Sequence, residues 1–412
     1  QSKGSWYRNE QESNRVETIH RTTIAGDSVN IEATKGKVTT EGAKVSAKTT
    51  AIYGEQGVNL RGAKATTTQT ARAEFKNETA RLKTGLSSQD SSVQHYTATE
   101  LTTEQDLILG GKGDVHLTGV VANVDGALLA KNSGSLSFGS ERSSESYNLS
   151  DDMRFWGGLA GSKTVGTGRS AETVHGADFT VKGDATLDAS RGVHISGSRV
   201  VTGGNGVVKG NAGALVIDST QAKTTAVDYA RQGTIFDITK ARQSSYTHTS
   251  TAKGSTLKSA SNLQLSTNKN VSIVGSTVQS AGLLDIAAKS GIEVKGAANH
   301  VRTESSKAGF SFAGGFDSLK TSFQHGHLTA NLNLDNNKGK PSVDADVEIS
   351  KEKKADAINA EGKFHLGLNV YNNSQNSHTT THTGSSVKGN DVALNAKTVT
   401  VSGSEVAATH GN

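Results

Sequence analysis

A short repeated motif constrains this chain more than any other feature. The sequence Val-His-Ile-Ser-Gly-Ser at residues 193–198 returns in similar form at 271–276 and 399–404, with weaker copies at 58–63 and 115–120. Two apolar residues separated by one polar residue lie on the same face of a β-strand. The glycine that follows permits a turn that a side chain would obstruct. One such strand cannot bury its apolar face alone, so the motif predicts a stack of similar units.

The spacing of the copies supports this interpretation. The interval from Val115 to Val193 equals the interval from Val193 to Val271, whereas the interval from Val271 to Val399 is longer and contains a large insert. A fixed period is typical of repeat architectures, whereas a β-sandwich with fortuitous Gly-Ser turns would not produce it. We therefore predict an all-β fold, a parallel right-handed β-helix. The predicted core positions are Val58, Leu60, Val115, Leu117, Val193, Ile195, Val271, Ile273, Val399 and Val401.

We predict one continuous β-helical unit over residues 1–412, interrupted by extrahelical excursions. Between the repeat blocks the chain becomes rich in Ser, Thr, Glu and Lys, which is not typical of a buried column. The segment after Ala73 is ambiguous, because Phe75 to Leu82 suits either a strand or a helix. The predicted excursions cover about residues 1–23, 65–100, 141–172, 221–253 and 300–383.

The composition suits a solenoid better than a thick globular core. Hydrophobic residues make up 33% of the chain and aromatic residues 5%, both low for a globular protein. A β-helix needs only a thin apolar column, and the single proline suits continuous strand ladders. Disorder is the alternative, but it usually accompanies many prolines and high net charge, and the net charge here is +5. The absence of cysteine excludes disulfides and thiol catalysis.

The sequence carries no recognisable targeting or membrane-helix signal. No apolar run approaches the roughly 20 residues of a membrane helix, and no signal peptide is recognisable at the start. Because the sequence starts and stops inside the repeat pattern, we expect it to be a fragment of a longer protein.

The longest excursion contains four stretches in which apolar and polar residues alternate. They begin at Phe310, Leu328, Val343 and Phe364, and turn signals such as Asn-Asn-Lys-Gly at 336–339 separate them. This pattern predicts antiparallel hairpins that stand off the solenoid. The stretches run about seven to nine residues, near the 9–11 of a membrane-spanning strand. Packing of the apolar face against the protein itself is the favoured alternative, because that face includes alanines.

These stretches, together with an apolar segment of the 141–172 excursion, supply the predicted membrane or partner contacts. They are Phe155, Trp156, Phe310, Phe312, Leu332, Leu334, Val347, Ile349, Phe364, Leu366 and Leu368.

Several of these segments resemble a known family. Gly-Ser-Thr-Leu at 254–257, the Val-x-Ile-x-Gly-Ser motif, Thr303 to Phe312, and His378 to Ser385 together look like haemagglutinin-repeat regions of filamentous-haemagglutinin-like exoproteins of Gram-negative bacteria. Contact-dependent growth-inhibition effectors share such regions. The resemblance covers nearly the whole sequence, and it rests on the ordered combination of motifs rather than on any single one.

The resemblance implies a secreted, surface-bound filament exported by a partner outer-membrane transporter. It also implies a non-catalytic role as stalk and target-cell contact during toxin delivery in contact-dependent growth inhibition. The alternative is a host-cell adhesin segment on the same scaffold. No residues here match the family's secretion domain or a toxin.

Catalytic, metal and nucleic-acid functions find little support in the sequence. Asp151-Asp152 and the pair Asp184 and Asp188 are the only close carboxylates that could serve a polysaccharide-acting enzyme, but the first pair lies in a loop-like excursion and the second at turns, where Asp is common. His378 and His382 would align only on a helix, and no carboxylate accompanies them. We therefore predict no catalytic site, no metal and no cofactor.

A single tight basic cluster stands at residues 351–354, Lys-Glu-Lys-Lys, and no aromatic residues interleave it. It is better explained as a solvated hairpin tip than as a nucleic-acid site. Weak attraction to an anionic glycan is compatible with it.

Overall fold

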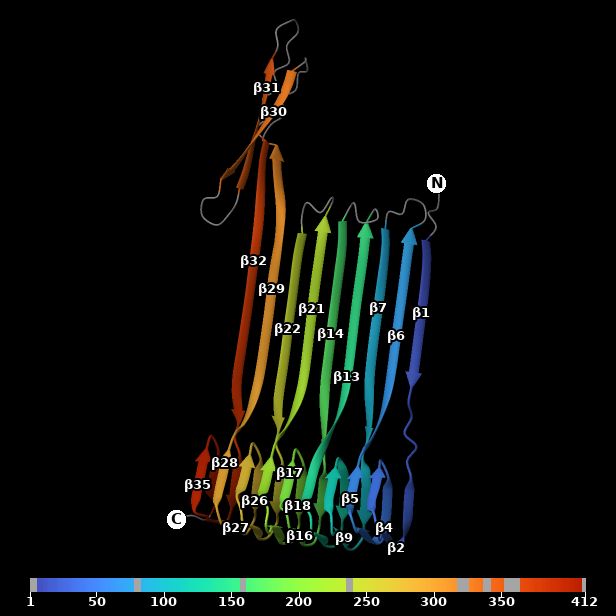
Figure 1. Cartoon of the computed structure of the whole chain (residues 1–412), viewed down its shortest axis with the longest axis vertical. Coiled ribbons are helices and arrows are strands. Elements are labelled where there is room, and N and C mark those ends of the chain that lie inside the picture. Colours follow the sequence, from blue (N-terminus) through green and yellow to red (C-terminus); the bar gives the residue numbers. More distant parts are fainter. Residues whose placement is uncertain are drawn as a thin grey trace.

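The fold is a β-solenoid with a second, antiparallel sheet standing on it (Figure 1). The structure is a computed structural model and describes residues 6–77, 83–155, 161–234, 240–316, 326–335, 342–351 and 364–409. Every regular element among these residues is a β-strand. The segment after Ala73 is therefore strand rather than helix as far as Asn77.

One coil of the solenoid consists of three short strands. Strands β15 (Asp178–Val181), β16 (Ala185–Ala189) and β17 (Val193–Ser196) form one coil, and β18 (Arg199–Thr202), β19 (Gly206–Gly210) and β20 (Leu215–Asp218) form the next. Each strand pairs in parallel with its counterpart in the next coil; Asp178 lies beside Arg199, 21 residues later. The predicted parallel β-helix is confirmed.

The other coils repeat this plan. Before this pair lie β2 (Thr23–Ala33), β3 (Lys37–Glu41), β4 (Lys44–Gly54), β5 (Gly57–Arg61), β8 (Thr99–Thr103), β9 (Leu107–Gly111), β10 (Asp114–Thr118), β11 (Val120–Val124), β12 (Leu128–Asn132) and the first residues of β13 (Leu136–Phe155). After it lie β23 (Thr256–Ser259), β24 (Leu263–Thr267), β25 (Val271–Val274), β26 (Thr277–Ser280), β27 (Leu283–Ala288), β28 (Gly291–Lys295), β33 (Ser386–Gly389), β34 (Asp391–Asn395), β35 (Thr398–Ser402) and β36 (Glu405–Ala408).

Long hairpins leave one corner of the solenoid after every second coil. They consist of β6 (Ala63–Asn77) with β7 (Lys83–Thr97), β13 with β14 (Gly161–Gly176), β21 (Thr220–Thr234) with β22 (Lys240–Lys253), and β29 (Ala297–Phe316) with β32 (Phe364–Thr383); β1 (Trp6–Val16) joins them. Neighbouring hairpins also pair with each other, through β7 and β13, β14 and β21, and β22 and β29. The result is one antiparallel sheet, called here the hairpin sheet, in the order β1-β6-β7-β13-β14-β21-β22-β29-β32 (Figure 1).

The geometry of strand spacing explains why the hairpins merge. Strands in a sheet lie about 4.8 Å apart, so two coils rise about 10 Å along the solenoid axis, and one two-stranded hairpin is also about 10 Å wide. A hairpin after every second coil therefore fills the rise completely. The fixed interval between copies of the motif is the sum of two coils and one hairpin. Asp178 pairs with Arg199, and Arg199 pairs with Thr256. The interval from Asp178 to Thr256 is the same as the interval from Val193 to Val271.

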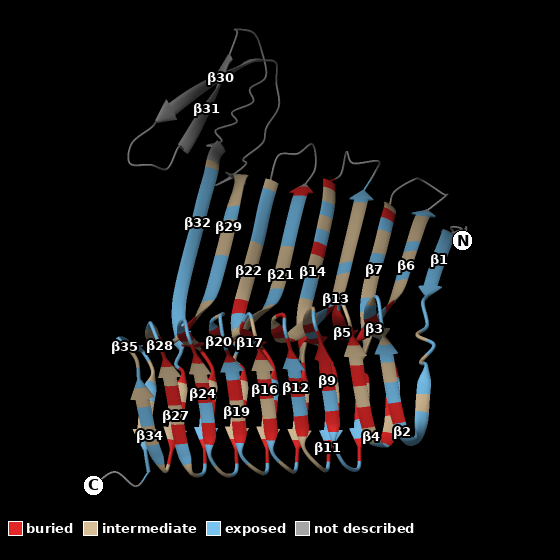
Figure 2. Ribbon diagram, turned by 60° about the horizontal axis from the view of Figure 1, so that its bottom comes forward, coloured by how far each residue is buried: buried red, intermediate tan, exposed pale blue. Residues whose placement is uncertain are grey.

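The core is a narrow column inside the coils, and the hairpin sheet has no comparable buried layer (Figure 2). Phe138 and Phe179, in successive coils, meet edge to face with ring centroids 5.0 Å apart. Of the residues predicted for the core, Val58, Leu60, Val115, Leu117, Val193, Ile195, Val271 and Ile273 are at most 2% exposed.

Two predicted core residues depart from this pattern. Val399 and Val401 are each 45% exposed. Their strand, β35, pairs with β28 on one side and with no described strand on the other, so no coil covers their outer side. Their register partners Ile292 and Val294 are buried, so Val399 and Val401 occupy inward positions of the last described coil but are not buried there.

The Gly-Ser pair of the motif builds a buried hydrogen-bond ladder along the solenoid. The backbone N–H of Ser198 donates to Oγ of Ser255 (3.2 Å), that of Ser255 to Ser276 (3.0 Å), and that of Ser276 to Ser385 (3.2 Å). The preceding glycine turns the chain directly into the next coil: Gly197 has a φ of 57°, and a Cβ there would lie 2.4 Å from the Thr220 side chain. Both residues of the dipeptide are thus explained by close packing at one corner.

The fourth hairpin carries two further strands, β30 (Gly326–Asp335) and β31 (Ser342–Lys351), beyond the end of the others (Figure 1). Strand β30 pairs with β31, and β31 pairs with the start of β32, all antiparallel. We call β30, β31 and the distal parts of β29 and β32 the tip sheet. The predicted antiparallel hairpins at 300–383 are confirmed by this pairing.

Candidate functional site

The hairpin sheet is the candidate interaction surface, because it stands off the solenoid and shows both faces to solvent (Figure 2). Alternate residues of each strand lie on opposite faces. We call the face that carries Ser150, Tyr229 and Arg231 face A, and the face that carries Tyr147 and Arg169 face B. The strand register assigns all remaining residues of the hairpin sheet to one of these two faces.

A shallow depression of about 480 Å³ lies on face A, over β13, β14 and β21. Its floor is open because β14 has glycine at two successive face A positions, Gly166 and Gly168. The Tyr229 ring lies over Gly166, where an added Cβ would come within 2.2 Å of it, and Tyr229 donates a hydrogen bond to Oγ of Ser150 (3.3 Å). The depression combines an aromatic ring that is 41% exposed with hydroxyl and amide groups.

A second depression of about 510 Å³ lies behind the first, on face B. It is lined by Val93, Tyr147 and Ala226, with Arg169 and Glu145 at its margin. The guanidinium of Arg169 is already paired with the carboxylate of Asp228 (3.0 Å). The face B depression has fewer polar groups than the face A depression, and the charge of Arg169 is neutralised by Asp228.

Aromatic residues gather at the distal end of the hairpin sheet. Phe155 is 37% exposed, and the ammonium of Lys83 lies 5.8 Å from the Phe75 ring centroid and 5.9 Å from that of Phe155. Phe310 is partly buried and pairs in register with Val370, which is 49% exposed. Trp156, the neighbour of Phe155 in the predicted contact set, lies outside the described residues.

The tip sheet brings the remaining predicted contact residues into register. Leu332 lies opposite Ala345 and Leu334 opposite Val343, while Val343 and Ala345 lie opposite Leu366 and Phe364. The other register pairs of this set are Ala330 with Val347, Leu328 with Ile349, and Phe312 with Leu368. Directly opposite residues share a face, so the apolar positions of all four strands fall on one face of the tip sheet.

A polar cluster of Tyr96, Ser143, His175 and Lys253 lies where the hairpin sheet meets the solenoid. We call this boundary the seam. The rings of Tyr96 and His175 are stacked 4.0 Å apart, and Nε2 of His175 lies 2.8 Å from Oγ of Ser143. Burial lowers the pKa of His175, and the ammonium groups of Lys253 and Lys64 lower it further. The Lys253 ammonium donates to the carbonyl of Val174 (2.7 Å). These contacts hold successive hairpins to the same corner.

Three of the four carboxylates considered for catalysis have hydrogen-bond partners within the protein. Asp184 accepts a hydrogen bond from the backbone N–H of Asn205 (2.6 Å), one coil on, and Asp188 accepts one from the Asn211 side chain (2.8 Å). Asp151 and Asp152 lie in strand β13 rather than in a loop. As neighbours in a strand they face opposite sides of the sheet, so they cannot act together on one substrate.

The histidines considered for metal binding do not share a site. His378 and His382 lie in strand β32, where four residues span about 13 Å, too far for one ion. His378 instead stacks on His300, with centroids 5.7 Å apart. No group of His, Cys, Asp or Glu side chains that could hold a metal ion occurs among the described residues.

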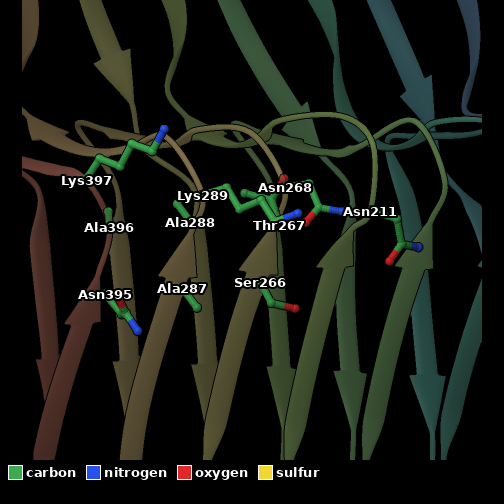
Figure 3. Close-up of a pocket in the computed structure, with 10 residues that line it drawn as sticks. All are labelled: Asn211, Ser266, Thr267, Asn268, Ala287, Ala288, Lys289, Asn395, Ala396 and Lys397. Carbon is green, nitrogen blue, oxygen red and sulfur yellow. The ribbon is translucent and has the colours of Figure 1, made fainter.

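A third depression, of about 570 Å³, follows a corner of the solenoid near the end of the chain (Figure 3). Asn268, Lys289 and Lys397 occupy its margin in successive coils. The polar groups at this corner serve the turns: Oγ1 of Thr267 donates to the carbonyl of Gly210 (2.8 Å), and the N–H of Lys289 donates to the carbonyl of Thr267 (3.1 Å).

The basic cluster at 351–354 lies outside the described residues, except for the backbone of Lys351.

Comparison with known proteins identifies similar sequences. The family model described as "Hemagglutinin repeat" matches residues 3–153 and 236–412. A protein named Hemolysin from Proteus mirabilis is 27% identical over 312 residues, which cover 75% of this chain and 20% of that protein. A Hemolysin from Serratia marcescens is 28% identical over 313 residues, with the same coverage.

The chain thus spans about a fifth of the length of these relatives. No solved structure matches it. No helix in the described part of the chain could cross a membrane.

Proposed function

Because the chain belongs to the hemagglutinin-repeat family of secreted, cell-surface exoproteins, we propose that it is a non-catalytic stalk segment that contacts the surface of a target cell. The solenoid supplies length and stiffness, since every coil is tied to the next by three parallel strand pairs. The hairpin sheet and the tip sheet supply the contact surfaces. A partner outer-membrane transporter exports the whole protein.

The register of the tip sheet carries the proposal. Four strands from the longest hairpin place their apolar positions on one face, and the tip sheet extends beyond the other hairpins (Figure 1). An alternating strand with one apolar face is suited to lie against another apolar surface, such as a membrane or a partner protein. We infer that Phe312, Leu332, Leu334, Val347, Ile349, Phe364, Leu366 and Leu368 form this contact, and that Phe155, Trp156 and Phe310 belong to the same contact set.

The more specific form of the proposal is a role in toxin delivery during contact-dependent growth inhibition. In this form, the tip sheet engages the outer membrane of a neighbouring bacterium. The alternative is a host-cell adhesin, in which the same surface engages a eukaryotic cell. The name Hemolysin borne by both relatives is compatible with a role at cell surfaces in either form.

Co-sedimentation with membranes tests the proposal. The test variant lacks residues 317–363, and an Asn-Gly turn joins Phe316 to Phe364, which are paired in register. In the control variant, an Asn-Gly turn replaces residues 235–239 between β21 and β22. Each protein is mixed with Gram-negative outer-membrane vesicles or with erythrocyte ghosts, pelleted and treated with protease.

We expect the intact chain and the control to pellet and become protease-protected, while the variant without the tip stays in the supernatant. Binding to vesicles but not ghosts would support delivery, and binding to ghosts but not vesicles would support the adhesin. Equal pelleting of the tip-deleted variant, or no pelleting of the intact chain, would contradict the proposed role of the tip sheet.

A further inference from the structure

Two arginines face each other on the open surface of the hairpin sheet. Arg231 of β21 and Arg242 of β22 are direct register partners, so their Cβ atoms lie about 5 Å apart on face A. Both side chains are exposed, and neither guanidinium has a hydrogen bond or ion pair within the described part of the chain. Like charges directly opposite each other destabilise a sheet, so this pair costs stability unless an anion lies between them.

Two described carboxylates near the pair on face A already have partners within the protein. The nearest one in register is Asp152, two strands away, which binds Arg154 (3.3 Å) and Oγ1 of Thr164 (3.1 Å). Glu304 of β29 is paired with Arg302. Arg154 and Arg302 on face A are thus neutralised, whereas Arg231 and Arg242 face each other with both guanidiniums open to an external anion.

The residues beside the pair suit a sugar. Tyr229 lies two residues before Arg231 on the same face, and its ring lies over Gly166 with one side toward solvent. Ser244 of β22, opposite Tyr229, lies within 3.1 Å of Ser306 across the next strand pair. The face A depression, with its hydroxyl and amide groups, continues from Tyr229 toward β13.

We propose that Arg231, Arg242 and Tyr229 form a binding site for a sugar that carries a phosphate or sulfate ester. The two guanidiniums bind the tetrahedral oxyanion by paired N–H···O hydrogen bonds, a geometry that guanidinium provides and ammonium does not. The sugar ring lies against Tyr229, and its hydroxyls reach the depression. The inference rests on the surface-contact function proposed above and gives one of its contacts a ligand class.

Saturation-transfer NMR on the full chain tests the site, with galactose 6-phosphate, galactose 6-sulfate, galactose and inorganic phosphate as probes. The test variant is the double substitution Arg231→Ala and Arg242→Ala. The control is Lys163→Ala with Lys307→Ala, which removes the same charge from exposed positions of face B at a similar height. A second variant, Tyr229→Ala, separates ring recognition from anion recognition.

We expect both sugar esters to bind, with galactose weaker by about tenfold or more, as expected for loss of a charge-assisted bidentate contact. The arginine variant should lose binding of the esters, and the control should keep it. Tyr229→Ala should weaken binding of the esters but not of inorganic phosphate. The tighter of the two esters shows which oxyanion the site prefers.

Equal loss of binding in the control variant would overturn the site, because it would show attraction to net charge alone. Inorganic phosphate binding as tightly as the sugar esters would overturn the role of Tyr229. The probes are soluble and need no membrane, so failure here leaves the vesicle experiment on the tip sheet unaffected, and the reverse also holds.

Discussion

Inward-facing Val, Leu and Ile residues are the residues on which the solenoid depends. Ile273 is fully buried in the column, while its neighbour Ser272 lies on the outer side of the same strand. Because a strand alternates faces, a charge at one of these positions is buried and at the other is solvated.

We therefore expect Ile273→Asp to lower the free energy of unfolding by at least about 3 kcal/mol, since the carboxylate has no partner in the column. Ser272→Asp should change it by less than about 0.5 kcal/mol. Chemical denaturation followed by circular dichroism measures both. Equal stability of the two variants would contradict the assigned inward and outward positions.

His175 gives the seam a dependence on pH. Its pKa is lowered in the folded protein by burial and by the nearby cations. Between the usual value of 6.5 and the lowered value, the unfolded chain binds more protons than the folded chain, so stability falls as the pH falls through this window.

Accordingly, the melting temperature should drop from about pH 7.5 to about pH 5.5 in the wild type and drop less in His175→Phe, which keeps a ring against Tyr96 without the titration. Differential scanning calorimetry at several pH values measures the difference. An identical pH profile in both proteins would show that His175 contributes no pH dependence.

The two candidate sites differ in whether the sequence alone could predict them. The apolar alternation around Leu332 and Val347 is visible in the sequence, because it is local to each strand. Arg231 and Arg242 give no such signal, since they are eleven positions apart in the sequence and no motif links them. Only the register of β21 with β22 places them opposite each other.

At the scale of the strands, the hairpin sheet is held by ladders on both sides of each internal strand rather than by a core. Strand β21 pairs with β14 through Arg169 and Ala226 and with β22 through Ala226 and Thr247. Its stability therefore depends on backbone hydrogen bonds, and the low hydrophobic content of the chain follows from this design.

Replacing Ala226 by proline should break the ladder at the middle of β21, because proline has no N–H to donate. Amide hydrogen exchange followed by mass spectrometry should then become faster in β14, β21 and β22, while the solenoid strands keep their protection. Ala226→Ser is the control. Unchanged exchange in the hairpin strands would contradict the observed pairing.

The strands themselves could be predicted, but their lateral joining could not. Alternation within a strand is a local pattern, and the motif at 193–198 indicates the coils. Pairing of β7 with β13, or of β14 with β21, depends on the rise of two coils matching the width of a hairpin. The fixed interval between motif copies equals the combined length of two coils and one hairpin. The interval alone does not show which residues belong to the coils and which to the hairpin.

For the molecule as a whole, the central claim is that two coils and one hairpin form a unit that keeps the solenoid and the hairpin sheet in step. Two deletions separate the alternatives. Removal of residues 178–198 takes out one coil, so Ala177 continues into Arg199, the ladder counterpart of Asp178. Removal of residues 177–254 takes out one whole unit of two coils and a hairpin and joins Gly176 to Ser255.

Both deletions preserve the parallel stacking of the coils. The shorter one leaves the hairpins β13–β14 and β21–β22 only one coil apart, so their four strands, about 19 Å wide, must share the rise of three coils, about 14 Å, instead of four. The longer one leaves β14 next to β29 with the original spacing.

The measurement that tests this most directly is hydrogen exchange of the hairpin strands in the two deletion variants. We predict that the longer deletion keeps the remaining hairpin strands protected, and that the shorter deletion exposes β13, β14, β21 and β22 while the coils stay protected. Equal protection of the hairpin strands in both variants would contradict the account, because it would show that the hairpins do not need two coils each.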